Sequence, residues 1–407
     1  MEIILKNAIV DASNQLVDIA IDNGIIQNIE PNFIGMADRV YDCEGRVVIP
    51  GLVESHIHLD KALIANRLPN KSGTLKEAIE VTGKLKSTFT KEDVLERASE
   101  AIEMLIKNGT TYVRTHAEFD PIGGFHGFET IMELKKKYKG IIDIEVVAFP
   151  QEGIYKSPGT EDMMYRAIEM GADIVGGIPY NDIDAKEHID LIFKLAKKYD
   201  RDIDLHQDFK DDYEGQSIEY LCEKTIAEGY QGRVSVGHLT TLGAMPDDLL
   251  NPIIEKLAEA QINVMCLPMT DLHLGGRNDA FNVRRAVTPV RKLRDGGVNV
   301  CLATNNIRNP FTPYGNGDLL QVAMLAIPVA HLGGADDIHT VLPMITTSPA
   351  KALKLRDYGM EVGCKGTVVV LDTKKYENAI LDIPARLLVV KDGKVTVELI
   401  QHKIRNY

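Results

Sequence analysis

Two histidines, His56 and His58, stand two residues apart at the end of an apolar run, and this spacing is the first chemical signal in the sequence. Successive side chains of a β-strand point to opposite faces, so a strand would turn both imidazoles the same way. Imidazole is a good ligand for Zn and Fe, and two of them on one face can begin a metal site. A packed or solvated histidine pair is the alternative, and the pair taken alone favours that alternative.

Three further histidines, His116, His206 and His238, also end apolar runs. If these runs are the strands of a (β/α)8 barrel, their carboxyl ends open on one mouth, where such enzymes keep their active sites. Five of the 11 histidines then gather at one mouth, which is hard to attribute to chance. The positions therefore predict a metal centre. His238 is the best candidate for a general base, because a neutral imidazole accepts a proton near pH 7; a buried structural histidine is its alternative.

Eight apolar, Val/Ile-rich runs alternate with amphipathic stretches through the middle of the chain. The runs are Val47–His56, Thr111–His116, Ile142–Phe149, Asp173–Ile178, Asp202–His206, Val234–His238, Ile262–Leu267 and Val298–Ala303; the stretches between them include Lys91–Lys107, Ala185–Lys198 and Leu249–Ala260. Apolar runs of this kind are typical of parallel strands covered on both faces. Eight such units predict an α/β fold, a (β/α)8 TIM barrel. A doubly wound open sheet is the alternative, and the lack of a GxGxxG motif after any run disfavours it.

Both ends of the chain read as short strands separated by turns. These strands are Ile3–Leu5, Ala8–Val10, Leu16–Ile21 and Ile25–Ile29 at the start, and Gly366–Leu371, Arg386–Val390 and Lys394–Leu399 at the end. Asp392-Gly393 is a strong hairpin signal. Neither end is long enough to bury a two-sheet core alone. We therefore expect a composite β-sandwich domain of residues 1–49 plus 356–407, beside a (β/α)8 barrel of residues 50–355.

Composition limits the partners of this chain. Its 407 residues carry 59 acidic and 46 basic side chains, for a net charge of −13, which argues against a nucleic-acid partner. No apolar run reaches about 18 residues and the start lacks signal-peptide features, so no membrane association is expected. Five scattered cysteines without a CxxC pair favour reduced thiols in the cytoplasm. A small-molecule partner remains, and a homo-oligomer is an open option.

A longer pattern surrounds the first two histidines. The string VIPGLVESHIHLD (48–60) resembles the opening of the metal barrels of the amidohydrolase superfamily. Later strings resemble its cytosine deaminase-like branch, in chain order: SGTL (72–75), VRTHAE (113–118), AFPQEGI (148–154), GADIVGGIP (171–179), DLHQD (204–208) and HLGGR (273–277). The resemblance covers nearly the whole predicted barrel.

The resemblance implies a metal-dependent amidohydrolase or deaminase that hydrolyses a C–N bond of a small nitrogen heterocycle. It implies one divalent metal ion, Zn or Fe, held by His56, His58 and His206, with His238 beside the attacking water. It also implies that Gln151 hydrogen-bonds the amide edge of a flat ring. No lysine follows the fourth predicted strand, in the segment 178–183, which argues against a carbamate-bridged pair of metals.

Three positions depart from this branch. Phe209 stands where the branch has a glutamate that carries protons to the ring, and Asn305 stands where it has an aspartate that ligates the metal. Asn306 occupies a neighbouring, usually acidic position. The Asn305 carbonyl could still bind a cation, but an amide is uncharged and cannot act as a base. We therefore count Asn305 as a fourth, weak ligand and expect a weakly held metal.

Several other residues are candidates for the substrate pocket. Lys61 and Asn306 are predicted to bind substrate, and Phe311 and Tyr180 could sandwich a ring, although core packing is the usual role of such aromatics. The acids that could replace the lost proton carriers are Asp208, Asp211, Asp212, Glu118 and Asp271. Each is more typical of a solvated or helix-capping residue. The Gly-rich loop Gly123–Gly127 could be a lid.

The departures leave two alternatives to a metal-dependent hydrolase. One is a catalytically degenerate barrel that binds a heterocycle without turning it over. The other is a hydrolase that works without a tightly held metal. The metal content of the purified chain separates these alternatives from the leading hypothesis.

Overall fold

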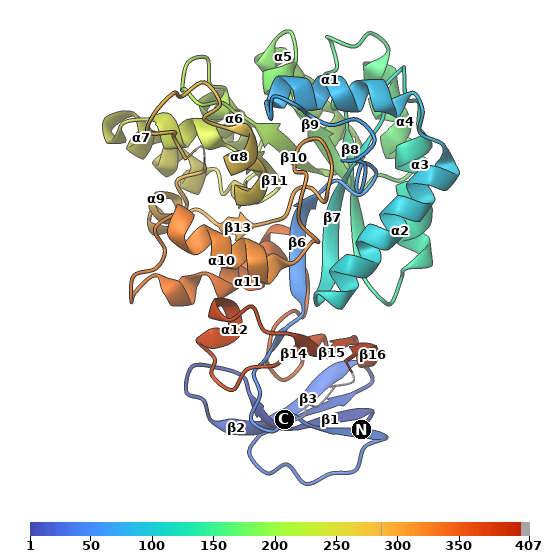
Figure 1. The fold of residues 1–407 in the computed structure, drawn as a ribbon, viewed down its shortest axis with the longest axis vertical. Helices are drawn as coiled ribbons and strands as arrows, with labels where there is room; N and C mark the ends of the chain where they lie inside the picture. The colour runs from blue at the N-terminus through green and yellow to red at the C-terminus, as the bar shows by residue number, and fades with distance from the viewer. Residues whose placement is uncertain (286, 400–407) are drawn as a thin grey trace.

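The computed structural model describes residues 1–285 and 287–399, and a parallel eight-stranded sheet forms its centre (Figure 1). Its strands pair in chain order, β6 to β13. They are β6 (Leu52–Ile57), β7 (Thr110–Glu118), β8 (Asp143–Phe149), β9 (Ile174–Gly177), β10 (Asp202–Gln207), β11 (Val234–His238), β12 (Asn263–Cys266) and β13 (Val300–Leu302). The residues after β13 return to β6, because Asn305 N donates to His56 O and His58 N donates to Asn305 O, both at 2.9 Å. The predicted TIM barrel is confirmed.

Helices occupy the connections and surround the strands (Figure 1). They are α1 (Leu75–Lys86), α2 (Lys91–Lys107), α3 (His126–Lys137), α4 (Thr160–Glu169), α5 (Ala185–Tyr199), α6 (Ile218–Ala227), α7 (Asp247–Glu259), α8 (Pro268–Leu274), α9 (Val290–Asp295), α10 (Leu319–Val329), α11 (Thr347–Ala352) and α12 (Asn378–Leu381), with 3-10 turns η1 (Pro179–Asn181), η2 (Thr240–Ala244), η3 (Ile338–Thr340) and η4 (Leu342–Ile345). Helix α2 spans the stretch predicted for it. The Thr90 side chain accepts from Asp93 N at its start, and Val94, Ala98, Ala101 and Leu105 bury one face. In the described part of the chain, no helix combines the length and apolarity needed to cross a bilayer.

Two four-stranded sheets from the ends of the chain lie beside the barrel (Figure 1). One has the order β3-β2-β1-β4 and the other β16-β15-β14-β5. Their strands are β1 (Ile3–Ile9), β2 (Leu16–Asp22), β3 (Ile25–Glu30), β4 (Arg39–Asp42), β5 (Val48–Pro50), β14 (Val368–Leu371), β15 (Arg386–Lys391) and β16 (Lys394–Glu398). One apolar cluster joins side chains of both sheets, among them Leu5, Ile19, Val368 and Leu388. The terminal sheets are confirmed; the boundaries 1–49 plus 356–407 and 50–355 remain a proposal, and residues 400–407 lie outside the described residues.

The predicted first barrel strand, Val47–His56, is divided in two at Gly51. Strand β5 pairs antiparallel with β14 in the terminal sheet, whereas β6 pairs with β7 in the barrel. Gly51 N donates to Thr367 O, and the next amide, Leu52 N, donates to Gly109 O. A Cβ on Gly51 would lie 2.3 Å from Thr111 Oγ1, so the crossover requires glycine. The apolar run is continuous because both of its halves are buried, although in different sheets.

The first terminal sheet also differs in detail from the prediction. Ile3–Leu5 and Ala8–Val10 belong to one strand, β1, whose register shifts between Leu5 and Ala8. Asn7 lies at this bulge with a left-handed φ of 54°, a conformation that asparagine tolerates. Strand β4, which pairs parallel with β1, was not predicted from the sequence.

Candidate metal and substrate site

Three histidine side chains converge at the carboxyl end of the barrel. The Nε2 atom of His206, on β10, lies 3.3 Å from His56 Nε2 and 2.9 Å from His58 Nε2. With Zn–N bonds of 2.0–2.1 Å, ligands of a tetrahedral ion lie about 3.3 Å apart. All three side chains are buried. The structure therefore brings together the three histidines expected to share an ion, with His206 Nε2 within 3.3 Å of the Nε2 atoms of the other two. Among the described residues, two further groups that share His56 are also close enough to hold an ion: His56 with His206 and His238, and His56 with His58 and His116.

The neighbouring strands make room for these rings. Gly237 on β11 pairs in register with His206, and a Cβ at this glycine would lie 2.5 Å from Cε1 of His56. A larger residue at position 237 would therefore displace the His56 ring. Phe149, which ends β8, stacks on the His206 ring with centroids 4.2 Å apart and fixes its plane.

The electrostatics of the three rings suit a bound cation. Burial, reinforced by repulsion among the neighbouring cationic and imidazole groups, holds the pKa of His56, His58 and His206 well below the usual value, so each is neutral. Their Nδ1 atoms are buried and have no hydrogen-bond partner among the described residues. The carboxylates of Asp204 and Glu118 lie 3.9 Å from Nδ1 of His56 and His58 respectively. Neutral nitrogens with carboxylates behind them form a suitable donor set for a divalent ion.

Asn305 lies beside the histidines in a left-handed conformation, with φ of 62°. Its Oδ1 atom is buried and has no hydrogen-bond partner, so it can accept a cation. Glu54 holds this segment in place: it accepts hydrogen bonds from Thr304 N, Thr304 Oγ1 and His56 N. Burial raises the pKa of Glu54 to about 7. Three neutral imidazoles and an unpartnered amide oxygen are donors whose chemistry suits one divalent ion.

His238 is held differently from the other three histidines. It ends β11, and its Nδ1 lies 2.6 Å from Oδ1 of Asp271 on α8. Its ring also packs against Phe209, with centroids 4.7 Å apart. Because Asp271 occupies Nδ1, Nε2 is the nitrogen available to the site. Nothing in the spacing of the sequence indicates this pair, since its members are separated by 33 residues.

The other proposed proton carriers have structural roles. Asp208 accepts from Ser217 N and Ile218 N and so caps α6. Asp211 accepts from Gly276 N and ties two loops together. No contact of Asp212 with the site is present among the described residues. These three acids therefore do not form part of the site.

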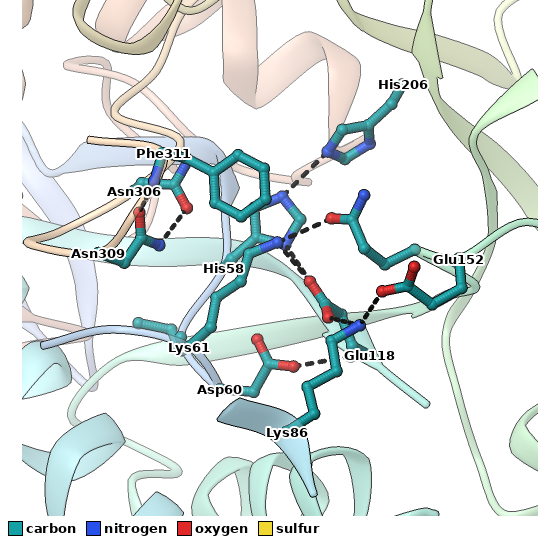
Figure 2. Close-up of polar contacts among 12 residues, drawn as sticks. His58, Asp60, Lys61, Lys86, Glu118, Glu152, His206, Asn306, Asn309 and Phe311 are labelled. Carbon is teal, nitrogen blue, oxygen red and sulfur yellow. Dashed lines mark hydrogen bonds and ion pairs between the residues drawn. The ribbon is translucent and has the colours of Figure 1, made fainter. Parts of the chain in front are cut away.

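Lys61 connects the site to a network of buried charges (Figure 2). Its ammonium group donates to Gln151 Oε1 at 2.9 Å and forms an ion pair with Glu118. Lys86 Nζ lies 2.7 Å from the same carboxylate and 2.8 Å from Glu152. Burial acts to raise the pKa of Glu118, but the charges of Lys61 and Lys86 outweigh it and lower the pKa below its usual value. The two ion pairs favour the anionic form of Glu118, which makes it a poor proton carrier.

A small cavity lies against the histidines. It is lined by His58, Lys61, Leu75, Gln151, Tyr180, His206, His238, Thr270, Leu274, Asn305, Asn306 and Phe311, and this lining contains no carboxylate. Phe311, Leu274 and Phe209 form an apolar cluster with α1 over it. Asn306 Oδ1 accepts from Asn309 Nδ2 at 2.6 Å, which orients the amide toward Thr270. The structure places the predicted substrate residues Gln151, Lys61, Asn306 and Phe311 around this single cavity.

The loop Gly123–Gly127 does not cover this cavity. It borders a separate cavity that Glu118, Asp60 and Lys86 also line. His116 also lies outside the lining, and its Nε2 is 3.2 Å from Asp204 Oδ1. The loop Gly123–Gly127, proposed as a lid, therefore does not line the cavity beside the histidines.

The sequence matches the amidohydrolase family over two overlapping segments, residues 39–122 and 72–397. The chain belongs to the amidohydrolase family. Over 406 residues it is 32% identical to N-isopropylammelide isopropyl amidohydrolase from Pseudomonas sp. (strain ADP), covering 98% of this chain and 97% of the relative. It is 28% identical to pterin deaminase from Rhizobium rhizogenes, covering 93% and 87% of the two chains.

A solved structure has the same architecture throughout. The 5-methylcytosine deaminase from Klebsiella pneumoniae, liganded with 5-fluorocytosine, superimposes with a TM-score of 0.94, at 33% identity and 99% coverage of both chains. This similarity confirms the resemblance seen in the sequence. As a member of the amidohydrolase family, the protein is a hydrolase of C–N bonds other than peptide bonds.

Proposed function

We propose that this amidohydrolase uses one divalent ion, Zn or Fe, to hydrolyse a C–N bond of a small, oxygen-bearing nitrogen heterocycle. The observation that carries the proposal is the convergence of the His56, His58 and His206 Nε2 atoms beside the cavity that Gln151 and Lys61 line. The named substrates of the relatives, isopropylammelide, pterin and cytosine derivatives, are all small heterocycles and support this class.

His56, His58 and His206 would hold the ion, with Asn305 Oδ1 as a weaker fourth ligand. A bound divalent ion supplies Lewis acidity that activates water near neutral pH. Because the amide is neutral where a carboxylate would be anionic, we propose that the ion is held more weakly than in a site with an aspartate.

His238 would move the proton during the reaction. Its Nε2 accepts a proton from the attacking water as the new C–O bond forms on an sp² ring carbon. It then returns this proton to the leaving nitrogen as the C–N bond breaks, which releases ammonia or an amine. The attacking water oxygen and the leaving nitrogen are bonded to the same ring carbon, so one imidazole can take the proton from the first and deliver it to the second.

Gln151 and Lys61 would select the edge of the ring. The Oε1 atom of Gln151 accepts from Lys61 Nζ, so the amide presents its Nε2 donors to the cavity. The two side chains therefore offer donors only, and they match a substrate edge that carries carbonyl oxygens or unprotonated ring nitrogens. Phe311 and Tyr180 would cover the face of the ring.

The absence of a carboxylate from the cavity lining also restricts the substrate. Plain cytosine benefits from protonation of its ring nitrogen, which the branch assigns to a glutamate, and Phe209 cannot protonate. We therefore propose a ring that is electron-poor without protonation, such as an oxygenated triazine with an amino or alkylamino substituent. Cytosine itself should be a poor substrate.

Turnover and metal analysis of the purified protein test this proposal. N-isopropylammelide, pterin and cytosine form the panel, with released amine or ammonia as the readout. Stoichiometric Zn or Fe with release of an amine supports the proposal. A metal-free chain that binds a panel member without turnover indicates the degenerate barrel, and chelator-resistant turnover indicates a metal-independent hydrolase.

All five cysteines are free, which supports the predicted cytoplasmic location; the oligomeric state stays a prediction.

Replacing Gln151 with Glu should weaken binding of a neutral heterocycle. The carboxylate removes the Nε2 donors and places an anion in the pocket, and loss of a hydrogen bond in a buried site costs about 1–3 kcal/mol. The expected result is a roughly 5- to 150-fold rise in the Kd for N-isopropylammelide in calorimetric titration. Gln27→Glu, at an exposed position of β3, is the matched control. An unchanged Kd would remove Gln151 from the substrate site.

A further inference from the structure

We infer that Asp271 is a positioning residue that fixes His238 in the tautomer whose Nε2 is unprotonated and faces the reacting centre. This inference rests on the proposed function of His238 as the base. The carboxylate of Asp271, on α8, would thereby influence proton transfer at His238. Asp271 acts through the imidazole and does not line the cavity.

The contact between the two side chains is short and buried. Asp271 Oδ1 lies 2.6 Å from His238 Nδ1, and the exposed fractions of the two residues are 0% and 4%. When the Asp271 carboxylate is ionised it can only accept a hydrogen bond, which would place the proton of a neutral His238 ring on Nδ1. Oδ2 of Asp271 has no hydrogen-bond partner among the described residues. The carboxylate therefore interacts with a titratable side chain through the hydrogen bond between Oδ1 and His238.

The other three histidines of the site show the opposite arrangement. Their Nε2 atoms converge, whereas their Nδ1 atoms have no hydrogen-bond partner within the described structure. A metal ligand needs a lone pair and tolerates a distant carboxylate behind the ring. A base that must accept a proton at one chosen nitrogen needs a fixed tautomer. The short hydrogen bond is a geometric difference between His238 and the other three histidines, and it would fix the tautomer that a base at this position needs.

One further contact restrains the His238 ring and another restrains its backbone. Phe209 packs against the ring with an interplanar angle of 45°, and Thr288 Oγ1 donates to the backbone carbonyl of His238. The backbone has a left-handed φ of 70°, which histidine adopts more readily than most residues. Phe209 stands where the cytosine deaminase-like branch has a glutamate, and here its side chain packs against the His238 ring.

The other carboxylates near the histidines have different partners. Glu118 forms ion pairs with Lys61 and Lys86. Asp204 lies 2.9 Å from Arg114 Nη1 and 3.2 Å from His116 Nε2. Asn305 and Asn306 are amides and carry no negative charge. Within the described structure, the carboxylate that forms a hydrogen bond with a histidine of the cavity lining is that of Asp271, with His238.

The test measures the tautomer of His238 directly in the metal-loaded protein. Nitrogen-15 NMR of the histidine rings, assigned with His238→Asn, should show the proton of His238 on Nδ1. In Asp271→Asn, the amide can donate to Nδ1, and the proton should move to Nε2. With N-isopropylammelide, kcat should fall by about 100-fold or more while KM and metal content stay unchanged; the corresponding change in the serine-protease triad costs about 10⁴-fold. Asp247→Asn, at an exposed position, is the control.

Each outcome bears on the inference. A parent spectrum with the proton on Nε2 would overturn it without any variant, so a variant that fails to fold does not remove the test. An Asp271→Asn protein with unchanged tautomer and unchanged kcat would overturn it as well. Failure of the proposed function is distinguishable, because a protein that turns over no heterocycle still gives a readable tautomer.

Discussion

Replacing His206 with Asn should abolish metal retention and lower kcat/KM for N-isopropylammelide by at least about 10³-fold. The His206 Nε2 atom lies within 3.3 Å of the Nε2 atoms of both other predicted ligands, so its loss leaves an incomplete site. Changes behind a metal ligand already cost about 10- to 100-fold in affinity, and removal of a ligand should cost more. The site also has no anionic ligand to compensate.

The measurement is metal content after dialysis against a weak chelator, followed by steady-state kinetics. His339→Asn, an exposed histidine of η3, is the control and should retain both metal and activity. His206→Asn with full metal content would show that the three converging nitrogens do not share an ion. Retained metal with lost activity would assign to His206 a role in substrate binding instead.

The barrel could be predicted from the sequence because its signals are local. Each predicted run overlaps a barrel strand, and the Lys91–Lys107 helix has the predicted ends. Histidines at the ends of parallel strands must share a mouth, so the convergence of His56, His58 and His206 follows from the fold class. The division of 47–56 between two sheets could not be predicted, because burial produces the same apolar pattern in either sheet.

The contacts that support the site were not predicted, and the reason is physical. Glu54, Asp204 and Asp271 are buried acids whose partners come from other strands and loops, although Asp271 itself was among the candidate acids. A sequence pattern records the spacing within an element, but these contacts join elements separated by 33 residues or more. For the same reason the sequence does not distinguish Glu118 from Asp271 as candidate acids, although Glu118 forms ion pairs with two lysines and Asp271 contacts His238.

Two substitutions together should convert the site toward efficient cytosine deamination. Asn305→Asp returns an anionic ligand at a position whose Oδ1 is buried and free, and whose left-handed φ of 62° suits aspartate and asparagine alike. We expect it to raise metal affinity by about 10- to 100-fold. Cytosine turnover should remain low, because Phe209 still leaves no acid to protonate the ring.

Phe209→Glu supplies that acid beside His238, whose ring centroid lies 4.7 Å from that of Phe209. Alone it should gain little and lose stability, because Phe209 packs in the apolar cluster with Leu274 and Phe311. In the double variant the two carboxylates act in one proton path, so cytosine turnover should exceed the combined gains of the single variants. Metal content, melting temperature and kcat for cytosine are measured for the parent, both single variants and the double variant.

The matched control is Asn32→Asp, an exposed asparagine with a similar left-handed φ of 55°. It adds the same charge with the same backbone geometry, and it should change neither metal content nor turnover. Rapid cytosine deamination by the parent would mean that another acid already serves the ring nitrogen, with Asp271 acting through His238 as the first residue to examine. A folded double variant that binds no metal would show that the ligand set has diverged beyond Asn305, because the added carboxylate corrects only that position.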